Sequence, residues 1–357
     1  MSSMCKGMSI LMISQRFLPS IGGVEKHIRG LSSTLSRIGY ETTVLTWAHA
    51  RGLPTVETAD NIKIVRIPHE YGNHPVLGLL WVLTNRRLLG NPRLVHIHDP
   101  VPLFYWYLPL RVLWARKPVF MTFHGFESDP PKFRFVLLKR AASLLVDGTM
   151  CIGTFLRSVY RAGCEDYSPG AVDTGRPGET REGAVFVGRL ERDTGILEYI
   201  EALMKLRVNH GHRLTLVVCG SGSLEGEILS MARDLGVTVD LRGKVEDPSD
   251  TVGSSRVSFA AGYLSILEAM AAGTPVVGVA RSHLKMAYLS FVRELGGPIS
   301  VQSTSDGVAR EVARLLDDEQ MWHHISKTSR AFATRFTWEY LAGQYVSLWS
   351  GRRTHHR

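Results

Sequence analysis

The sequence has few cysteines, and this shortage limits what the protein can be. Among 357 residues there are only 4 cysteines, Cys5, Cys151, Cys164 and Cys219. They form no CxxC pair and have no zinc-binding spacing. We therefore expect reduced thiols, which are typical of a cytoplasmic protein, and no metal centre built on thiolates.

The sequence also lacks a long apolar run. Crossing a bilayer as a helix takes ~20 apolar residues, and the most apolar window, 101–115, contains prolines and Arg111. The run Met8–Ile13 is too short for the core of a secretion signal, so we interpret it as a first strand. We expect no transmembrane span.

Several catalytic motifs are missing as well. There is no Walker phosphate loop, no GxSxG nucleophile elbow, and no GxGxxG followed by the acidic residue expected of a dinucleotide dehydrogenase. The net charge of +9 is compatible with nucleic acid, anionic lipid or phosphorylated small molecules as partners. Because no nucleic-acid-binding motif accompanies the charge, we expect no nucleic-acid partner.

What the sequence does contain is an alternation of strand and helix patterns along its whole length. The stretch 168–183, rich in glycine, proline and charge, divides this alternation into two series and is interpreted as a linker. We predict an α/β fold with two Rossmann-like domains, whose parallel sheets face each other across a cleft. The expected domains are 1–172 and 173–334, followed by a helix over 335–350 and a disordered tail, 352–357.

The segment 257–280 is the strongest signal for a binding site. It is predicted to form a strand, a loop, a helix capped by Ser265 and ended by Gly273, and a second buried strand. A loop that opens a helix between parallel strands is a place where anions bind, because unpaired amides point outward there. Glu268 has a competing interpretation, since Ser265-x-x-Glu268 also fits a capping box.

Two further sites follow strands in the first series. Gly22 and Gly23 precede a helix over 24–38, where backbone can approach a phosphate or simply form a turn. His124 follows the predicted strand 118–123, where ligands bind in open α/β sheets, although a structural histidine fits the same place.

His96 and His98 alternate onto one face of a strand. They are expected to line a cleft, or alternatively to form a metal pair, although no third ligand is evident.

The region 101–140 combines apolar and basic side chains. This mixture predicts a surface that rests on anionic lipid, or alternatively a solvated basic face. The basic residues between 111 and 140 are Arg111, Arg116, Lys117, Lys132, Arg134, Lys139 and Arg140.

Taken together, the motifs resemble the retaining nucleotide-sugar glycosyltransferases of family 4, which have the two-domain GT-B fold. The resemblance covers nearly the whole chain, and its order and spacing are more specific than any single motif. The motifs are FLPSIGGVEKHIRGLSSTL, VHIHDP, TFHGFE, PGAVDT, VFVGRL, VVCGSGS, LEAMAAGTPVV and FTWEYLAGQY. The last resembles the family's final helix, which usually crosses back onto the first domain.

The resemblance implies roles for individual residues. His124 would lie beside the transferred sugar, Arg189 would contact the diphosphate, and Glu268 would accept hydrogen bonds from the ribose. These three are the predicted catalytic residues. The predicted donor-binding residues are Gly22, Gly23, Arg189, Thr194, Gly220, Gly243, Lys244, Val245, Leu264, Ser265 and Glu268.

Two positions depart from the family's pattern. The family usually has a glutamate where this chain has Ala260, and a lysine where it has Thr194. Each missing charged hydrogen bond would lower the free energy of donor binding by ~1–3 kcal/mol in magnitude. Arg192 or Arg281 is a candidate replacement for the lost positive charge. The departures leave an active transferase, a slow one or an inactive binding subunit as alternatives.

The predicted function is retaining transfer of a sugar from a nucleoside diphosphate donor to a glycan or lipid-linked acceptor. The scheme needs no cofactor and no metal, because Arg189 and a helix N-terminus can stabilise the leaving diphosphate. A sugar-nucleotide epimerase on the same fold is the alternative enzyme. We expect a cytoplasmic protein, peripheral at the inner face of the plasma membrane.

Overall fold

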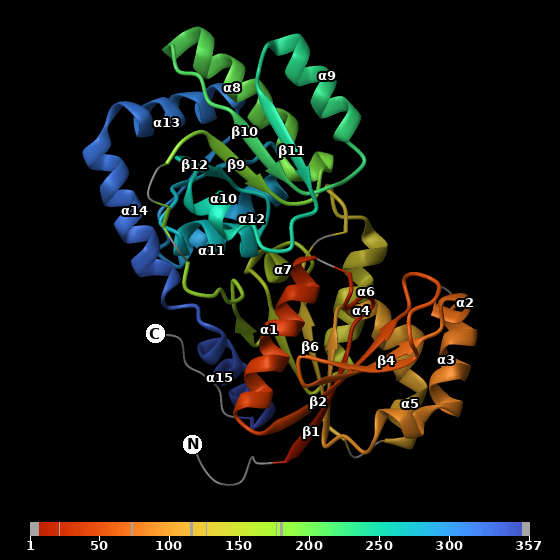
Figure 1. Cartoon of the computed structure of the whole chain (residues 1–357). Coiled ribbons are helices and arrows are strands. Elements are labelled where there is room, and N and C mark those ends of the chain that lie inside the picture. Colours follow the sequence, from red (N-terminus) through yellow and green to blue (C-terminus); the bar gives the residue numbers. More distant parts are fainter. Residues whose placement is uncertain are drawn as a thin grey trace. The chain divides into compact units, whose positions relative to one another are not determined.

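The computed structural model describes residues 7–20, 22–72, 74–114, 117–125, 127–175, 177–178 and 181–351, without the side chain of Val112. Arg116 and the predicted tail 352–357 lie outside the described residues. The chain forms two compact units (Figure 1). Unit 1 comprises Met1–Ser168 and Trp338–Arg357, and unit 2 comprises Pro169–Thr337.

Unit 1 is built on an eight-stranded sheet of order β3-β4-β2-β1-β5-β6-β7-β8, parallel except for the antiparallel pair β3–β4. The apolar runs of the sequence form its buried central strands. The short edge strands β3 and β8 were not predicted. The strands are β1 (Met8–Ile13), β2 (Tyr40–Trp47), β3 (Val56–Ala59), β4 (Ile62–Ile67), β5 (Leu94–His98), β6 (Val119–Phe123), β7 (Gly148–Cys151) and β8 (Asp166–Tyr167).

Helices cover this sheet. Helix α1 turns Ile28, Leu31 and Leu35 inward, as their helical spacing predicts. The C-terminal helix α15 packs against α1 and β7 and is therefore part of unit 1. The helices are α1 (Gly23–Arg37), α2 (His69–Gly72), α3 (Pro75–Thr84), the 3₁₀ turn η2 (Arg86–Leu89), α4 (Pro100–Pro102), the π-helix η3 (Leu103–Tyr107), α5 (Leu108–Leu113), α6 (Phe133–Leu144), α7 (Phe155–Ser158) and α15 (Trp338–Trp349).

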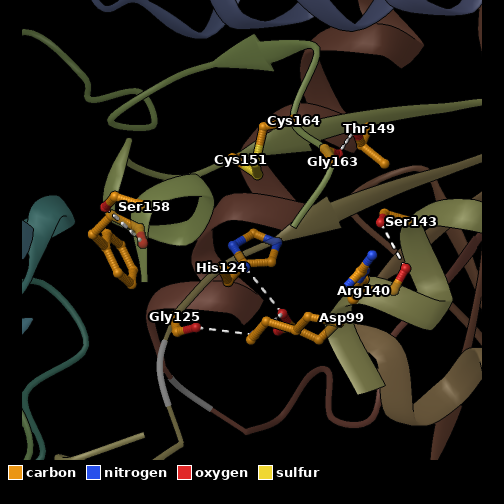
Figure 2. The surroundings of a disulfide bond; sticks show 12 residues. Asp99, His124, Gly125, Arg140, Ser143, Thr149, Cys151, Ser158, Gly163 and Cys164 are labelled. Atoms are coloured by element: carbon orange, nitrogen blue, oxygen red, sulfur yellow. Dashed lines mark hydrogen bonds and ion pairs between the residues drawn. A yellow bond between two sulfur atoms is a disulfide. The ribbon is translucent and has the colours of Figure 1, made fainter. Parts of the chain in front are cut away.

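The expectation of reduced cysteines is wrong for one pair. Cys151, at the end of β7, forms a disulfide with Cys164, which precedes β8 (Figure 2). The segment between them, which contains α7, folds back so that the two Cα atoms lie 5.7 Å apart, a proximity that a sequence separation of 13 does not reveal. Because disulfides are rare in a reducing cytosol, this pair gives no support to the predicted compartment.

Unit 2 is built on six parallel strands of order β11-β10-β9-β12-β13-β14. Its core lies between this sheet and helices α8, α9, α13 and α14. The strands are β9 (Ala184–Val187), β10 (Leu216–Cys219), β11 (Val239–Gly243), β12 (Val257–Phe259), β13 (Val276–Val279) and β14 (Ile299–Gln302).

The helices of unit 2 include one, α12, that the sequence did not predict, although Ser282 caps it through a hydrogen bond from the amide of Lys285. Strand β14 was missed as well. The helical elements are the 3₁₀ turn η4 (Arg192–Thr194), α8 (Ile196–His210), α9 (Glu225–Leu235), α10 (Ser249–Gly253), α11 (Tyr263–Ala271), α12 (His283–Glu294), α13 (Ser305–Asp317) and α14 (Glu319–Ala333).

The fold class is confirmed: the protein is α/β, with two mostly parallel sheets. Within the part of the chain that the structure describes, no helix is both long and apolar enough to cross a membrane.

The contact between α1 and α15 provides a test of packing in unit 1. A Cβ atom at Gly30 of α1 would lie 2.5 Å from the ring of Trp338, whereas one at Gly343 of α15 would meet no atom within 4 Å. We predict that Gly30→Ala destabilises the protein by about 1–3 kcal/mol through overpacking. The matched variant Gly343→Ala should be stabilising by up to about 1 kcal/mol, because alanine favours the helix. Urea unfolding of both variants measures the difference, and equal effects would contradict the packing described here.

Candidate functional site

The strand order of unit 2 places two loops at the same edge of its sheet. Strand β9 lies between β10 and β12, so the chain reverses its direction of growth there. The loops that follow β9 and β12 therefore open at a topological switch point, where α/β sheets bind ligands. Arg189 lies on the first loop, and the second leads into α11.

The N-terminus of α11 differs from the prediction. Gly262 is the N-cap, and the helix begins at Tyr263. Ser265, expected as the cap, lies in the first turn, where its hydroxyl accepts from the amide of Gly262 (3.3 Å) and donates to its carbonyl (2.9 Å). The competing interpretation, a capping box between Ser265 and Glu268, is therefore wrong, because Glu268 lies beyond the first turn.

First-turn amides of a helix have no acceptor within the helix, so they favour anions. The amide of Tyr263 already has a partner, since it donates to the hydroxyl of Tyr288 on α12 (3.1 Å). The amides of Leu264 and Ser265 follow it in the same turn, and both residues are half-buried. Glu268 is also half-buried, on the same helix.

Arg189 is two-thirds exposed and forms an ion pair with Asp193 (2.8 Å). The two arginines considered as substitutes for the missing lysine lie elsewhere. Arg192 binds Glu227 on α9 (2.9 Å), and Arg281 binds Glu198 on α8 (3.0 Å). Each of these guanidinium groups is held against a helix other than α11.

The remaining predicted donor residues of unit 2 have mixed surroundings. Thr194 is buried and donates its hydroxyl to the carbonyl of Glu191 (2.7 Å). The amide of Gly220 donates to the carbonyl of Gly243 (2.7 Å), and a Cβ at Gly220 would lie 1.8 Å from the carbonyl oxygen of Gly188. Packing alone therefore requires glycine at position 220. Lys244 is exposed and Val245 is half-buried.

In unit 1, Gly22 and Gly23 lie at the start of α1, as predicted. Gly23 is exposed, and a Cβ there would meet no atom within 4 Å. At Gly22 a Cβ would lie 2.5 Å from a carboxylate oxygen of Glu25, so this acidic side chain folds back over the helix start. An anion bound there would first have to displace Glu25.

Four histidines gather where β5 and β6 end and α1 begins. The Nε2 atom of His124 lies 2.8 Å from Nδ1 of His98. The ring of His124 packs edge-on against the ring of His27, with centroids 4.8 Å apart. His96 lies beside His98, with ring centroids 5.1 Å apart, as their alternation predicts. Burial lowers the pKa of all four imidazoles, that of His124 to about 3 with a further contribution from Lys139. All four are therefore neutral at physiological pH.

A chain of hydrogen bonds connects this cluster to α15. The indole of Trp349 can only donate, so it fixes Nδ1 of His96 as an acceptor (3.0 Å). Neutral His96 then donates from Nε2 to the hydroxyl of Thr122 (2.8 Å). This hydroxyl lies 2.7 Å from that of Tyr345, which lies 2.8 Å from Nε2 of His27. The last helix thus orients the histidines of the first sheet.

A second network holds the backbone of His124. Its amide donates to a carboxylate oxygen of Asp99 (3.0 Å), as Figure 2 shows. Asp99 has φ +65°, an uncommon conformation for aspartate. Lys139 is almost fully buried and forms an ion pair with Glu127 (2.8 Å), near Asp99 (3.9 Å). Burial raises the pKa of Asp99, while Lys139 and the amide oppose this effect.

The sequence did not identify Asp99 or Tyr345 as parts of a site, and it interpreted Lys139 wrongly as a surface residue. The motif VHIHDP contains Asp99, and the periodic aromatic residues of α15 contain Tyr345, but neither pattern reveals a tertiary contact.

As for the alternative of a metal pair at His96 and His98, the described residues contain no cluster of three or more His, Cys, Asp or Glu that could hold a metal ion.

Comparison with known proteins finds two family models, one that matches most of unit 1 and one that matches most of unit 2. Residues 21–170 match Glycosyltransferase Family 4, and residues 174–332 match Glycosyl transferases group 1. Over 94% of its length the chain is 26% identical to a glycogen synthase from Mycobacterium tuberculosis, of which it covers 92%. It is 31% identical to a D-inositol 3-phosphate glycosyltransferase from Salinispora arenicola, over 43% of this chain and 38% of that protein.

Among solved structures, a sucrose-phosphate synthase from Thermosynechococcus elongatus superposes with a TM-score of 0.76. The match covers 96% of this chain and 98% of that protein at 19% identity, which establishes the fold alone. Together with the two family matches, these similarities confirm the resemblance that the motifs predict.

The four neutral histidines predict how stability depends on pH. In the unfolded chain a histidine binds a proton near pH ~6.5, whereas burial disfavours this proton in the folded protein. Between pH ~6.5 and the lowered pKa values the unfolded chain binds more protons, so acidification favours unfolding, by up to ~1.4 kcal/mol per pH unit for each histidine. The raised pKa of Asp99 has the opposite effect, because acidification protonates it more readily in the folded protein, but it is one group and the histidines are four. We expect the unfolding free energy to fall as the pH is lowered from about 7.5 to about 5.

The variant His96→Gln should reduce this slope, because glutamine can hydrogen-bond to Thr122 and Trp349 without titrating. Thermal unfolding at several pH values measures the slope, with His210→Gln on the exposed surface of α8 as the control. A variant at His96 with the slope of the wild type would show that this imidazole is not held neutral.

Proposed function

The chain belongs to the glycosyltransferases of family 4, and we propose that it transfers a sugar from a nucleoside diphosphate donor to a glycan or lipid-linked acceptor, with the anomeric configuration retained. The observation that carries the donor assignment lies in unit 2. Arg189 and the first turn of α11 follow the two adjacent strands β9 and β12, at the switch point of a fully parallel sheet. Oriented amides and a permanently charged guanidinium together suit a diphosphate.

Each predicted catalytic residue has a distinct part in this proposal. Arg189 exchanges Asp193 for the diphosphate, and it stabilises the negative charge that develops on the diphosphate as this group leaves the sugar. Glu268 accepts hydrogen bonds from the ribose hydroxyls. His124, neutral and held by His98 and Asp99, contacts hydroxyl groups of the transferred sugar.

The proposed chemistry proceeds on one face of the sugar. The acceptor hydroxyl attacks from the side on which the diphosphate leaves, and a leaving phosphate oxygen takes the acceptor's proton. This route requires neither the paired carboxylates of glycoside hydrolysis nor a protein nucleophile. We propose that it also requires no metal and no cofactor, because Arg189 and the amides of α11 supply the positive charge.

The departures at Ala260 and Thr194 keep an inactive binding subunit as the alternative. Ala260 is buried, and its carbonyl accepts from the hydroxyl of Tyr199 (2.8 Å), so this position serves the packing of the sheet edge. Both family models that match the chain are of glycosyltransferases, and so is the relative from Salinispora arenicola, which favours transfer over donor epimerisation. Incubation of a labelled donor without acceptor distinguishes the two enzymes, since only an epimerase isomerises it.

We predict that Arg189→Ala and Glu268→Gln each weaken nucleoside diphosphate binding by about 10- to 100-fold, the effect of losing one charged hydrogen bond. Arg192→Ala is the matched control, because Arg192 lies in the same loop but binds Glu227. Calorimetric titration with uridine, guanosine and adenosine diphosphates measures the affinities. A transfer assay with the matching sugar nucleotide should retain its rate in chelator and give a product with the donor's anomeric configuration by NMR.

Unchanged affinity in both variants would refute the donor site. A wild-type protein that binds the diphosphate but transfers no sugar would instead favour the inactive binding subunit.

For the acceptor, we propose that unit 1 rests on an anionic membrane through α6, as a peripheral protein at the cytoplasmic face. Phe133, Leu137 and Leu144 are exposed by 79%, 55% and 80%, and they recur at the spacing of one helix face. Lys132, Arg134 and Arg140 lie exposed beside or among them. This combination of apolar and basic side chains is typical of helices that lie in a membrane interface.

Other basic residues of the predicted surface are engaged within unit 1. Lys139 is buried in its ion pair with Glu127, so its assignment to the surface is corrected here. Arg111 donates to the carbonyl of Leu145, and Lys117 donates to the side chain of Asn91 (2.6 Å). The proposed membrane contact is therefore confined to the exposed face of α6.

We predict that the protein floats with vesicles containing anionic lipid at low salt. Replacing Lys132, Arg134 and Arg140 by glutamine should weaken binding by about 100-fold, since each basic residue near a membrane contributes about 1 kcal/mol. The change Val208→Ser with Leu229→Ser, at exposed apolar positions of unit 2, is the control. Absence of the wild type from the floating fraction would exclude this membrane contact.

A further inference from the structure

We propose that Lys285 is a diphosphate-binding residue of the donor site, which supplies the positive charge that Thr194 does not. This assignment rests on the proposed function, because it adds a residue to the same site. Lys285 belongs to α12, the helix that the sequence did not predict, and no motif singled it out.

The ammonium group of Lys285 lies at the loop that opens α11. Only 6% of the residue is exposed, and Nζ donates to the carbonyl of Ala261 (3.1 Å), the residue before the N-cap Gly262. The backbone is fixed as well, since the amide of Lys285 donates to the hydroxyl of Ser282 (3.0 Å). A long flexible side chain is thus held with its charge beside the amide end of α11.

Two stacked tyrosines hold α12 against this helix start. The rings of Tyr263 and Tyr288 lie 4.1 Å apart and nearly parallel, at 17°. The hydroxyl of Tyr263 donates to the carbonyl of Tyr288 (2.6 Å), and the hydroxyl of Tyr288 accepts from the amide of Tyr263 (3.1 Å). Nζ of Lys285 lies 5.1 Å from the centroid of the Tyr288 ring. These contacts keep the ammonium group in place before a ligand binds.

The charge on a diphosphate explains why a second cation is required at this edge. The N-terminus of a helix provides the equivalent of only about half an elementary charge. Arg189 adds one charge, and Asp193 offsets it while the two remain paired. Burial raises the pKa of Tyr288, the amide of Tyr263 and Arg189 lower it, and Asp193 raises it. Lys285, in contact with the ring of Tyr288, is therefore our candidate for the second cation.

The alternative is that Lys285 only stabilises the loop by binding the carbonyl of Ala261. The two roles differ in what a substitution changes. A structural lysine would affect the binding of a nucleoside, its monophosphate and its diphosphate alike. A phosphate-binding lysine would affect the diphosphate far more than the nucleoside.

The test is calorimetric titration of the full chain with the nucleoside, monophosphate and diphosphate of uridine, guanosine and adenosine. The base whose diphosphate binds the wild type is then used for the variants. We expect Lys285→Met, which keeps the buried methylene chain, to weaken diphosphate affinity about 10- to 100-fold and nucleoside affinity less than about twofold. Lys285→Arg should recover most of the lost diphosphate affinity, because it restores the charge.

The matched control is Lys205→Met, which removes a lysine of α8 bound to Glu201 and Asp306. It should leave all three affinities unchanged. A wild-type protein that binds none of the three diphosphates would contradict the proposed function itself. A wild-type protein that binds, with Lys285→Met binding equally well or losing nucleoside and diphosphate affinity to the same degree, would overturn only the role of Lys285.

Discussion

The structure depends on how peptide dipoles are compensated at the edges of two mostly parallel sheets. In such sheets the carboxyl ends of the strands and the starts of the following helices meet at one edge, where backbone amides lack partners. In unit 2 the groups that we propose for diphosphate binding belong to this edge: the first turn of α11, Arg189 and Lys285. The nucleoside diphosphate sugar that we propose as the donor carries several negative charges and would complement this edge.

In unit 1 the equivalent edge of the sheet carries neutral side chains. The ends of β5 and β6 are filled with buried imidazoles that are neutral, so they donate and accept hydrogen bonds without adding charge. The series of hydrogen bonds from Trp349 to His27 connects α15 to these buried imidazoles. A neutral histidine such as His124 suits sugar hydroxyls, which are uncharged donors and acceptors. The two units thus present different chemistry on the same architecture.

The sequence predicted most of the fold because the buried parallel strands are short apolar runs and the helices have regular apolar spacing. It predicted α11 but placed its N-cap at Ser265 instead of Gly262, because glycine as the N-cap and Ser265 inside the first turn leave no distinctive pattern. It missed α12 and hence Lys285, whose importance lies in contacts with Ala261 and Tyr288. The Cys151–Cys164 disulfide was missed for the same reason. The spacing of apolar residues predicts helices and strands, whereas the residues that contact each other are known only from the tertiary structure.

The most direct test of the account is amide hydrogen exchange with and without the nucleoside diphosphate that the protein binds. We propose that the loops after β9 and β12 hold the diphosphate, so exchange should slow in segments 188–195 and 262–268. Lys285 should extend this protection into the first turn of α12. Binding without protection in both segments, or protection confined to other parts of unit 2, would contradict the claim.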